Sequence, residues 1–237
     1  MKPARYCFFV CLPLFTGCAS VYMPSPASIP LFEEKGETQI EAGVSTNSIF
    51  VVGNYAFSEK YALIANGNLS FYNFSSDLTI YPFYDVAHRS IETGLGRYNM
   101  IQNFKLPLEI FTGIRYGNAD RFTEARLEDK MWYLQSFIQV NFGKRSKYNE
   151  IGSSSRVAFS YISFAEMERK SSDIFYTDFS SLHLEQLCFF RFGGEHLKVT
   201  IRVGMSIMYP LFSYTSNKFD SELIIHLHHS VGLSYHF

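Results

Sequence analysis

Apolar residues recur at every second position over many segments of this chain. The last segment shows it most clearly, with Val231, Leu233, Tyr235 and Phe237 separated by small or polar residues. Alternation of this kind predicts a β-strand with one apolar and one polar face. Similar segments fill the chain from residue 37 onward, so the sequence predicts an all-β fold.

We expect about ten strands in residues 37–237. The segments run over 38–46, 48–56, 61–71, 89–98, 106–117, 131–143, 155–165, 182–193, 197–208 and 222–237. Segments of about 8 to 12 residues suit tilted strands that cross a membrane. An even number of strands also returns the C-terminus to the side from which the first strand starts.

The connections between these segments alternate in length. The expected inner connections are short or modest: 58–60, about 99–105, about 144–154 and 194–196. Apart from the first hairpin, the expected outer connections are long: 72–88, 118–130, 166–181 and 209–221. This rhythm is typical of membrane barrels with short periplasmic turns and long external loops. We therefore predict a single antiparallel up-and-down transmembrane β-barrel.

A soluble, lipocalin-like barrel would show the same alternation, with its apolar residues inside. Its cavity would have to accept bulky residues from nearly every strand, whereas a bilayer accepts any number. The aromatic content of 17% suits aromatic girdles at two membrane interfaces, although a protein core could use the same rings. The size of the apolar rows favours the membrane barrel.

The N-terminus is typical of an exported protein. Lys2 and Arg5 precede an apolar stretch at residues 6–15. The sequence Leu14-Phe15-Thr16-Gly17-Cys18 then resembles a lipoprotein signal, with Phe15 where such signals usually have leucine. We expect residues 1–17 to be a signal peptide and Cys18 to carry lipid, palmitate included; ordinary cleavage nearby is the alternative.

Export with acylation would leave Cys188 as the one remaining thiol, because Cys7 and Cys11 lie in the leader. An internal disulfide and a zinc–thiolate site are then excluded. No uncharged apolar stretch of about 18 residues follows the leader, so no transmembrane helix is expected. The formal net charge of -1 argues against a nucleic-acid partner.

Residues 18–36 are expected to form the lipidated N-terminus and a tether. Three prolines and the run Glu33-Glu34-Lys35-Gly36 disfavour regular structure there. Such a spacer would hold the barrel domain, residues 37–237, close to the periplasmic leaflet.

A family resemblance joins these features. The residues that carry it are the leader, Cys18, Val21, Tyr22 and Pro24, the glycine- and aromatic-rich segments 91–98 and 111–117, and the closing Gly232, Tyr235 and Phe237. The chain resembles small outer-membrane β-barrel lipoproteins of Gram-negative bacteria, whose last strand is an assembly signal. The resemblance implies an outer-membrane location, contact with outer-membrane lipid, and handling by the barrel-assembly and lipoprotein-sorting machinery. It implies no reaction.

If the apolar rows face outward, a set of ionisable residues faces the lumen. The predicted lumen network is Glu41, Glu92, Glu109, Arg115, Glu185, Arg191, Arg202, His226 and His228, with Lys198 and His183 on the same side. Paired, hydrated charges filling a narrow lumen are one interpretation, and a narrow pore for small solutes is the other.

His226, His228 and Ser230 share one face of the last strand, but same-face neighbours lie roughly 7 Å apart along a strand. No convergent metal ligands and no serine motif with an orienting acid accompany them. We therefore expect no catalytic residue, no metal and no cofactor.

The predicted outer loops are rich in aromatic residues, which could contact an extracellular glycan or protein ligand. The same rings could instead form the outer interface belt. The function favoured by the sequence is a structural or surface-interaction role through these loops. A narrow pore is the alternative, and a barrel enzyme acting on lipid or peptide is less favoured.

Overall fold

The computed structural model describes residues 26–45, 48–70, 85–101, 106–123, 126–167, 178–213 and 224–237. These residues form ten β-strands. The strands are β1 (Thr38–Ser45), β2 (Ser48–Tyr55), β3 (Tyr61–Ser70), β4 (Asp85–Ile101), β5 (Leu106–Thr123), β6 (Arg126–Arg145), β7 (Asn149–Met167), β8 (Phe179–Gly193), β9 (Leu197–Ser213) and β10 (Ile224–His236).

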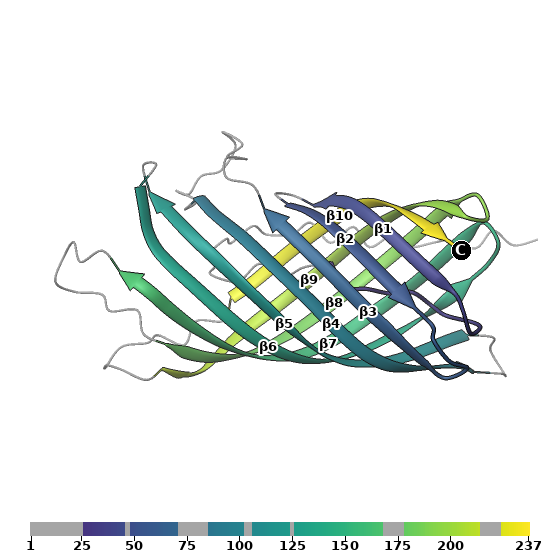
Figure 1. The fold of residues 1–237 in the computed structure, drawn as a ribbon, viewed down its shortest axis with the longest axis horizontal. Coiled ribbons are helices and arrows are strands. Elements are labelled where there is room, and N and C mark those ends of the chain that lie inside the picture. The colour runs from purple at the N-terminus through teal and green to yellow at the C-terminus, as the bar shows by residue number, and fades with distance from the viewer. Residues whose placement is uncertain are drawn as a thin grey trace, which may run out of the picture.

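The strands close into one antiparallel up-and-down barrel. Each strand pairs with its neighbours in the chain, and β1 pairs with β10 to complete the ring (Figure 1). The closing register runs from Gln39 opposite His236 to Ser45 opposite Ser230. The predicted fold class, the strand number and the pairing of the last strand with the first are confirmed.

The two ends of the barrel differ in their connections. We call the turn end the one with connections 56–60, 102–105, 146–148 and 194–196, where the C-terminus also lies (Figure 1). We call the other the loop end, with connections 46–47, 71–84, 124–125, 168–178 and 214–223. The expected inner connection at about 144–154 was too long, because β6 continues to Arg145 and β7 already begins at Asn149.

The predicted loop at 118–130 was wrong. The ladder between β5 and β6 continues through this segment, so only residues 124–125 separate the two strands. The register sets Asp120 directly opposite Lys130, and opposite charges across an antiparallel pair stabilise the ladder. A charge-rich segment can thus extend a hairpin, although its composition suggested a solvated loop.

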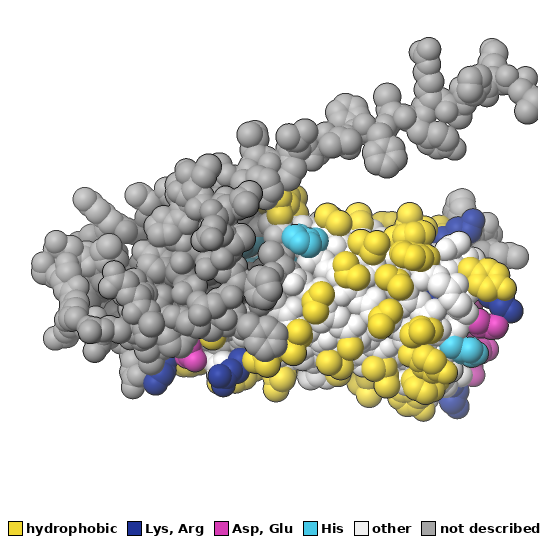
Figure 2. All heavy atoms as spheres, turned by 90° about the horizontal axis from the view of Figure 1, so that it is seen from above, with side chains coloured by type: hydrophobic (Ala, Val, Ile, Leu, Met, Phe, Trp, Pro, Cys, Tyr) yellow, Lys and Arg dark blue, Asp and Glu magenta, His cyan; other side chains and the backbone are white. Residues whose placement is uncertain are grey.

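Apolar side chains cover the outside of the barrel and polar ones line the inside. On β5, Ile110 and Ile114 are 50% and 56% exposed, whereas the adjacent Glu109 and Arg115 are fully buried. Figure 2 shows apolar side chains spread over the described outer surface, with charged side chains toward the two ends. A soluble barrel would have the opposite orientation, so the outer surface is that of a transmembrane barrel.

The height of this apolar surface fits a bilayer. On β5 the outward row runs from Leu106 to Tyr116, about 33 Å of strand at about 3.3 Å per residue. A tilt of about 45° reduces this to about 23 Å, close to the apolar band of about 25 Å in membrane barrels. Exposed aromatic rings gather at the turn end: Tyr55, Phe57, Tyr61, Tyr148, Phe192, Tyr235 and Phe237.

A segment without helix or strand lies inside the barrel. Residues 26–32, which we call the plug segment, precede β1 and are buried, with Ser28, Ile29 and Leu31 fully so. Phe32 packs with Ala56, Tyr98, Phe111 and Phe137 in one apolar cluster, and Ile29 and Leu31 pack with Leu187 and Phe189 in another. The irregular backbone agrees with the sequence, but its position in the lumen was not predicted.

No helix long and apolar enough to cross a membrane occurs in the part of the chain that the structure describes. Residues 1–25 lie outside that part, so the predicted signal peptide and the lipidation of Cys18 stay predictions.

Candidate functional site

Side chains of the barrel wall hold the plug segment through its backbone. The Asn66 Nδ2 group donates to the carbonyl oxygen of Pro26 at 2.6 Å. The Gln139 and Asn141 amides donate to the carbonyl oxygen of Ser28 at 2.6 and 3.2 Å. An irregular buried backbone requires such partners, because an unpaired peptide group away from water is costly.

Charged side chains hold the next part of the plug segment. Arg191 donates to the carbonyl oxygen of Ile29 at 2.6 Å, and Arg145 donates to that of Leu31 at 3.3 Å. The backbone N–H of Phe32 donates to Glu109 at 2.7 Å. Leu31 adopts φ 56°, a left-handed conformation that is uncommon for leucine, between two backbone groups fixed in this way.

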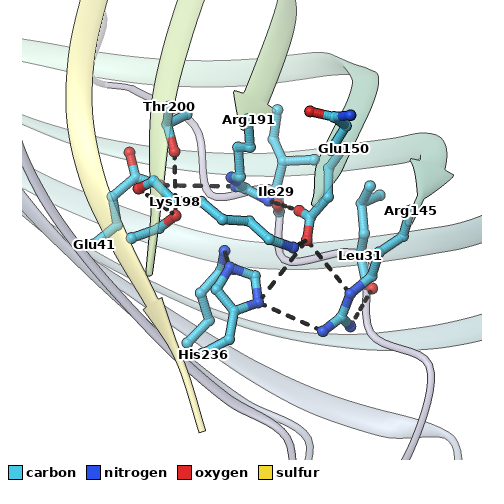
Figure 3. A network of polar contacts seen from close by, with 12 residues as sticks. Ile29, Leu31, Glu41, Arg145, Glu150, Arg191, Lys198, Thr200 and His236 are labelled. Carbon is cyan, nitrogen blue, oxygen red and sulfur yellow. Dashed lines mark hydrogen bonds and ion pairs between the residues drawn. The ribbon is translucent and has the colours of Figure 1, made fainter. Parts of the chain in front are cut away.

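Beside the plug segment lies a network that we call the turn-end ion network: Glu41, Arg145, Glu150, Arg191, Lys198 and Arg202. Figure 3 labels the first five of these residues. Glu150 is at its centre and accepts hydrogen bonds from Arg191 at 2.9 Å and from Lys198 at 2.6 Å. The Nε atom of Arg145 lies 3.4 Å from Glu150. These charges are removed from bulk water, so their attraction has to offset a desolvation cost of several kcal/mol per ion.

Glu41 links the network to the closing seam of the barrel. It accepts two hydrogen bonds from Arg202, one of them at 2.7 Å, and lies 3.7 Å from Arg191. Directly beside it, Gly232 of β10 has no room for a side chain, because a Cβ there would lie 2.7 Å from Glu41 Oε1. The glycine of the predicted assembly signal therefore also has a packing role in the folded barrel.

A second group, the mid-lumen cluster, is centred on Arg156. Its guanidinium donates to both carboxylate oxygens of Glu92 at 2.8 Å and to Gln139 at 3.0 Å. Glu185 lies 3.7 Å away, and the ring of Phe137 packs 4.3 Å from the guanidinium carbon. A bidentate pair of this kind fixes both side chains and fills the middle of the lumen.

The loop-end half of the lumen is less charged. His88 Nε2 and the Tyr133 hydroxyl are 2.8 Å apart, and their rings stack with centroids 5.6 Å apart. Arg115 donates to Ser90 at 3.2 Å and lies 5.5 Å from the Tyr133 ring. Tyr133 also packs with Ile162, Phe179 and Met208 in a buried apolar cluster from the neighbouring strands β6 to β9.

All nine residues of the predicted lumen network point inward. Seven are buried: Glu41, Glu92, Glu109, Arg115, Glu185, Arg191 and Arg202. His226 and His228 are half-buried on β10. The structure brings Glu41, Arg191 and Arg202 together, and it joins Glu92 to Glu185 through Arg156. Glu109 instead holds the plug segment, and Arg115 lies in the loop-end half.

Sequence reasoning missed three members of these clusters. Arg145 and Glu150 fell in the expected connection at 144–154, which the structure replaces by the ends of β6 and β7. Arg156 lies on the expected seventh strand, and its charge alone could have placed it inside, since charged side chains avoid the lipid face.

His226 and His228 lie on the inner face of β10, where His226 is opposite Ser206 of β9 in register. His226 Nε2 and Ser230 Oγ have no hydrogen-bond partner among the described residues. In the same part of the chain, no group of three or more His, Cys, Asp or Glu side chains is placed to hold a metal ion.

Known proteins with similarity to this chain are found by structure and not by sequence. No protein-family model matches it, and no curated protein matches its sequence. Among solved structures, it is similar to the translocator domain of the autotransporter NalP from Neisseria meningitidis. That similarity has 12% sequence identity and a TM-score of 0.39, and covers 85% of this chain and 87% of the other.

Proposed function

We propose that this protein is an outer-membrane β-barrel lipoprotein, closed by its own N-terminal segment, with a structural or surface-interaction role at its loop end. The observation that carries the proposal is the plug segment, which is buried among charged and polar wall residues inside a barrel with an apolar exterior. We propose no catalytic role and no cofactor.

The outer surface supports the proposed membrane location. Its exposed isoleucines, leucines, valines and aromatic rings would be unfavourable in water over so large an area, but they match the hydrocarbon region of a bilayer. Exposed aromatic rings at the turn end suit the interface with the headgroups. Outer-membrane lipid and the barrel-assembly and lipoprotein-sorting machinery are the proposed partners.

The closed state follows from what fills the lumen. Four cationic and two anionic side chains of the turn-end ion network pair with each other and with the plug segment. A gap lined by Ala27, Arg156, Glu185 and His228 is too small to hold a water molecule. A continuous path for solutes would need these groups to separate.

Lipidation of Cys18 would place an anchor near the plug segment. Pro26 is eight positions after Cys18, and a chain of that length spans at most about 28 Å. The anchor and the plug segment would therefore act as one unit, with the lipid restricting how far the segment can leave the lumen.

Reconstitution of the full-length protein in vesicles tests the proposal. We expect resistance to carbonate extraction and a gel migration that changes when the sample is heated. We also expect lipid labelling at Cys18 and no leakage of a trapped small dye. Sustained single-channel conductance from the unmodified protein would contradict the closed state. Extraction by carbonate without a lipid label would contradict the membrane anchor and the insertion together.

The second candidate is a narrow pore that opens when the plug segment leaves. It is favoured by one observation, which is that most hydrogen bonds to residues 26–32 involve the backbone and could be exchanged for water. Replacing residues 26–32 by a glycine-serine linker of equal length should then produce conductance. A barrel enzyme would instead require turnover of a lipid or peptide that is lost on replacing His226 or His228.

A further inference from the structure

The outer face of β2, β3 and β4 contains a groove within the apolar surface. It has a volume of 460 Å³ and is lined mainly by Ile49, Val51, Leu69, Ile91 and Tyr116. These residues come from strands that are adjacent in the sheet, because Val51, residue 67, Ile91 and Tyr116 lie opposite one another in register. The groove thus crosses neighbouring strands on the outside of the barrel.

Gly67 makes the groove. It occupies the outward position between Val51 and Ile91, and a Cβ placed on it would meet no atom within 4 Å. A larger side chain at this position would occupy part of the groove, because it would point into the open space between its neighbours. Its volume lies within the range of about 300–1,000 Å³ that is usual for small-molecule sites.

One edge of the groove carries a positive charge. Arg89 lies opposite Leu69 on one side and Asn118 on the other, and both Arg89 and Asn118 line the groove. Arg89 is exposed, and no carboxylate among the described residues pairs with it. A guanidinium at the edge of a hydrocarbon region is stabilised by an anionic partner, and its planar donors fit the oxygens of a phosphate.

The depth of Arg89 fits a lipid headgroup. Asn118, its neighbour in the sheet, lies opposite Trp132, and tryptophan is enriched at membrane–water interfaces. The apolar part of the groove therefore extends from the level of the headgroups into the level of the acyl chains.

We propose that this groove binds one acyl chain of a phosphate-bearing lipid in the loop-end leaflet, with the lipid phosphate paired to Arg89. The proposal rests on the proposed insertion into a membrane, and it goes beyond it by assigning a specific lipid site. Charge complementarity at Arg89 selects the phosphate, and the apolar hollow above Gly67 selects the chain.

The test measures lipid binding to the full-length protein in detergent micelles by native mass spectrometry. The probes are phosphatidic acid and a diacylglycerol with the same two acyl chains but no phosphate. We expect phosphatidic acid to bind at least about tenfold more tightly, as one charge-assisted pair to phosphate provides. Equal binding of the two probes would overturn the proposal.

Two variants and two matched controls locate the site. Arg89→Gln should remove the preference for phosphatidic acid, whereas Arg97→Gln, an exposed arginine toward the turn end of the same strand, should keep it. Gly67→Leu should weaken binding of both probes by about tenfold. Gly53→Leu should leave both affinities within about twofold, because Gly53 also has open space but does not line the groove.

Losses of the same size in the control variants would overturn the lipid site. Carbonate extraction of each protein from vesicles separates this result from a failure of the proposed function. A protein that stays in the membrane but shows no discrimination contradicts only the groove, whereas a protein that is extracted contradicts the membrane location itself.

Discussion

Glu109 of β5 and Phe32 of the plug segment are joined across 77 residues of sequence by a hydrogen bond of 2.7 Å from the Phe32 N–H to the Glu109 carboxylate. The other carboxylate oxygen accepts a hydrogen bond of 2.9 Å from Asn141. One fully buried acid thus fixes the plug segment to two strands of the wall.

Removal of this acid should loosen the plug segment. Glu109→Ala leaves the Phe32 N–H and the Asn141 amide without a partner, and each such group costs about 1–3 kcal/mol. We expect a lower midpoint in urea unfolding and measurable dye leakage from vesicles. Glu109→Gln keeps one acceptor oxygen and should have a smaller effect, so equal effects of the two variants would contradict a hydrogen-bonding role.

Arg156 and Glu92 should depend strongly on each other. Arg156→Gln leaves the Glu92 carboxylate buried without its bidentate partner, which should cost about 3–5 kcal/mol of unfolding free energy. The double variant with Glu92→Gln should cost less than the sum of the single changes. A double-mutant cycle by urea unfolding checks this, and strict additivity would mean that the pair contributes no coupling.

The seam between β1 and β10 should not tolerate a side chain at Gly43. A Cβ there would lie 2.3 Å from the Val231 carbonyl oxygen, and Gly43 faces Gly232 directly in register. Gly43→Ala should therefore destabilise the barrel by about 1–3 kcal/mol. The fraction of heat-modifiable protein on a gel measures closure. Gly53→Ala, where a Cβ meets nothing within 4 Å, is the control and should keep normal closure.

Cys188 should be shielded by lipid. It faces outward on β8, opposite Val203 of β9, and is the free cysteine of the described residues. In vesicles, a charged maleimide should modify it slowly and a membrane-permeant maleimide rapidly, as followed by mass spectrometry of the peptide that contains residue 188. Lys147→Cys in a turn should react with both reagents. Rapid reaction of Cys188 with the charged reagent would place this face in water.

The wall of the barrel could be predicted from sequence because each strand carries its own period. Ile110 and Ile114 alternate with Glu109 and Arg115 in a segment that can be interpreted without knowledge of any other. The ends of the strands at the loop end were harder to predict from sequence, because Asp120 and Lys130 extend the ladder only when they meet across two strands.

The plug segment could not be predicted in the same way. Its place depends on partners far along the chain, such as Gln139 for Ser28 and Arg191 for Ile29, which are 111 and 162 residues away. Its own sequence contains two prolines close to each other and no period, and this indicates only an irregular backbone. Arg156 is a different case, because a charge near the middle of a membrane strand is far more stable in the lumen than against lipid.

The plug segment is continuous with β1, from which only residues 33–37 separate it. That linker spans at most about 18 Å, less than the strands it adjoins. Whatever brings β1 into register with β10 therefore also carries residues 26–32 to the mouth of the lumen. Closure of the barrel and filling of its lumen are therefore coupled, because the strand that completes the ring is joined by a short linker to the segment that occupies the lumen.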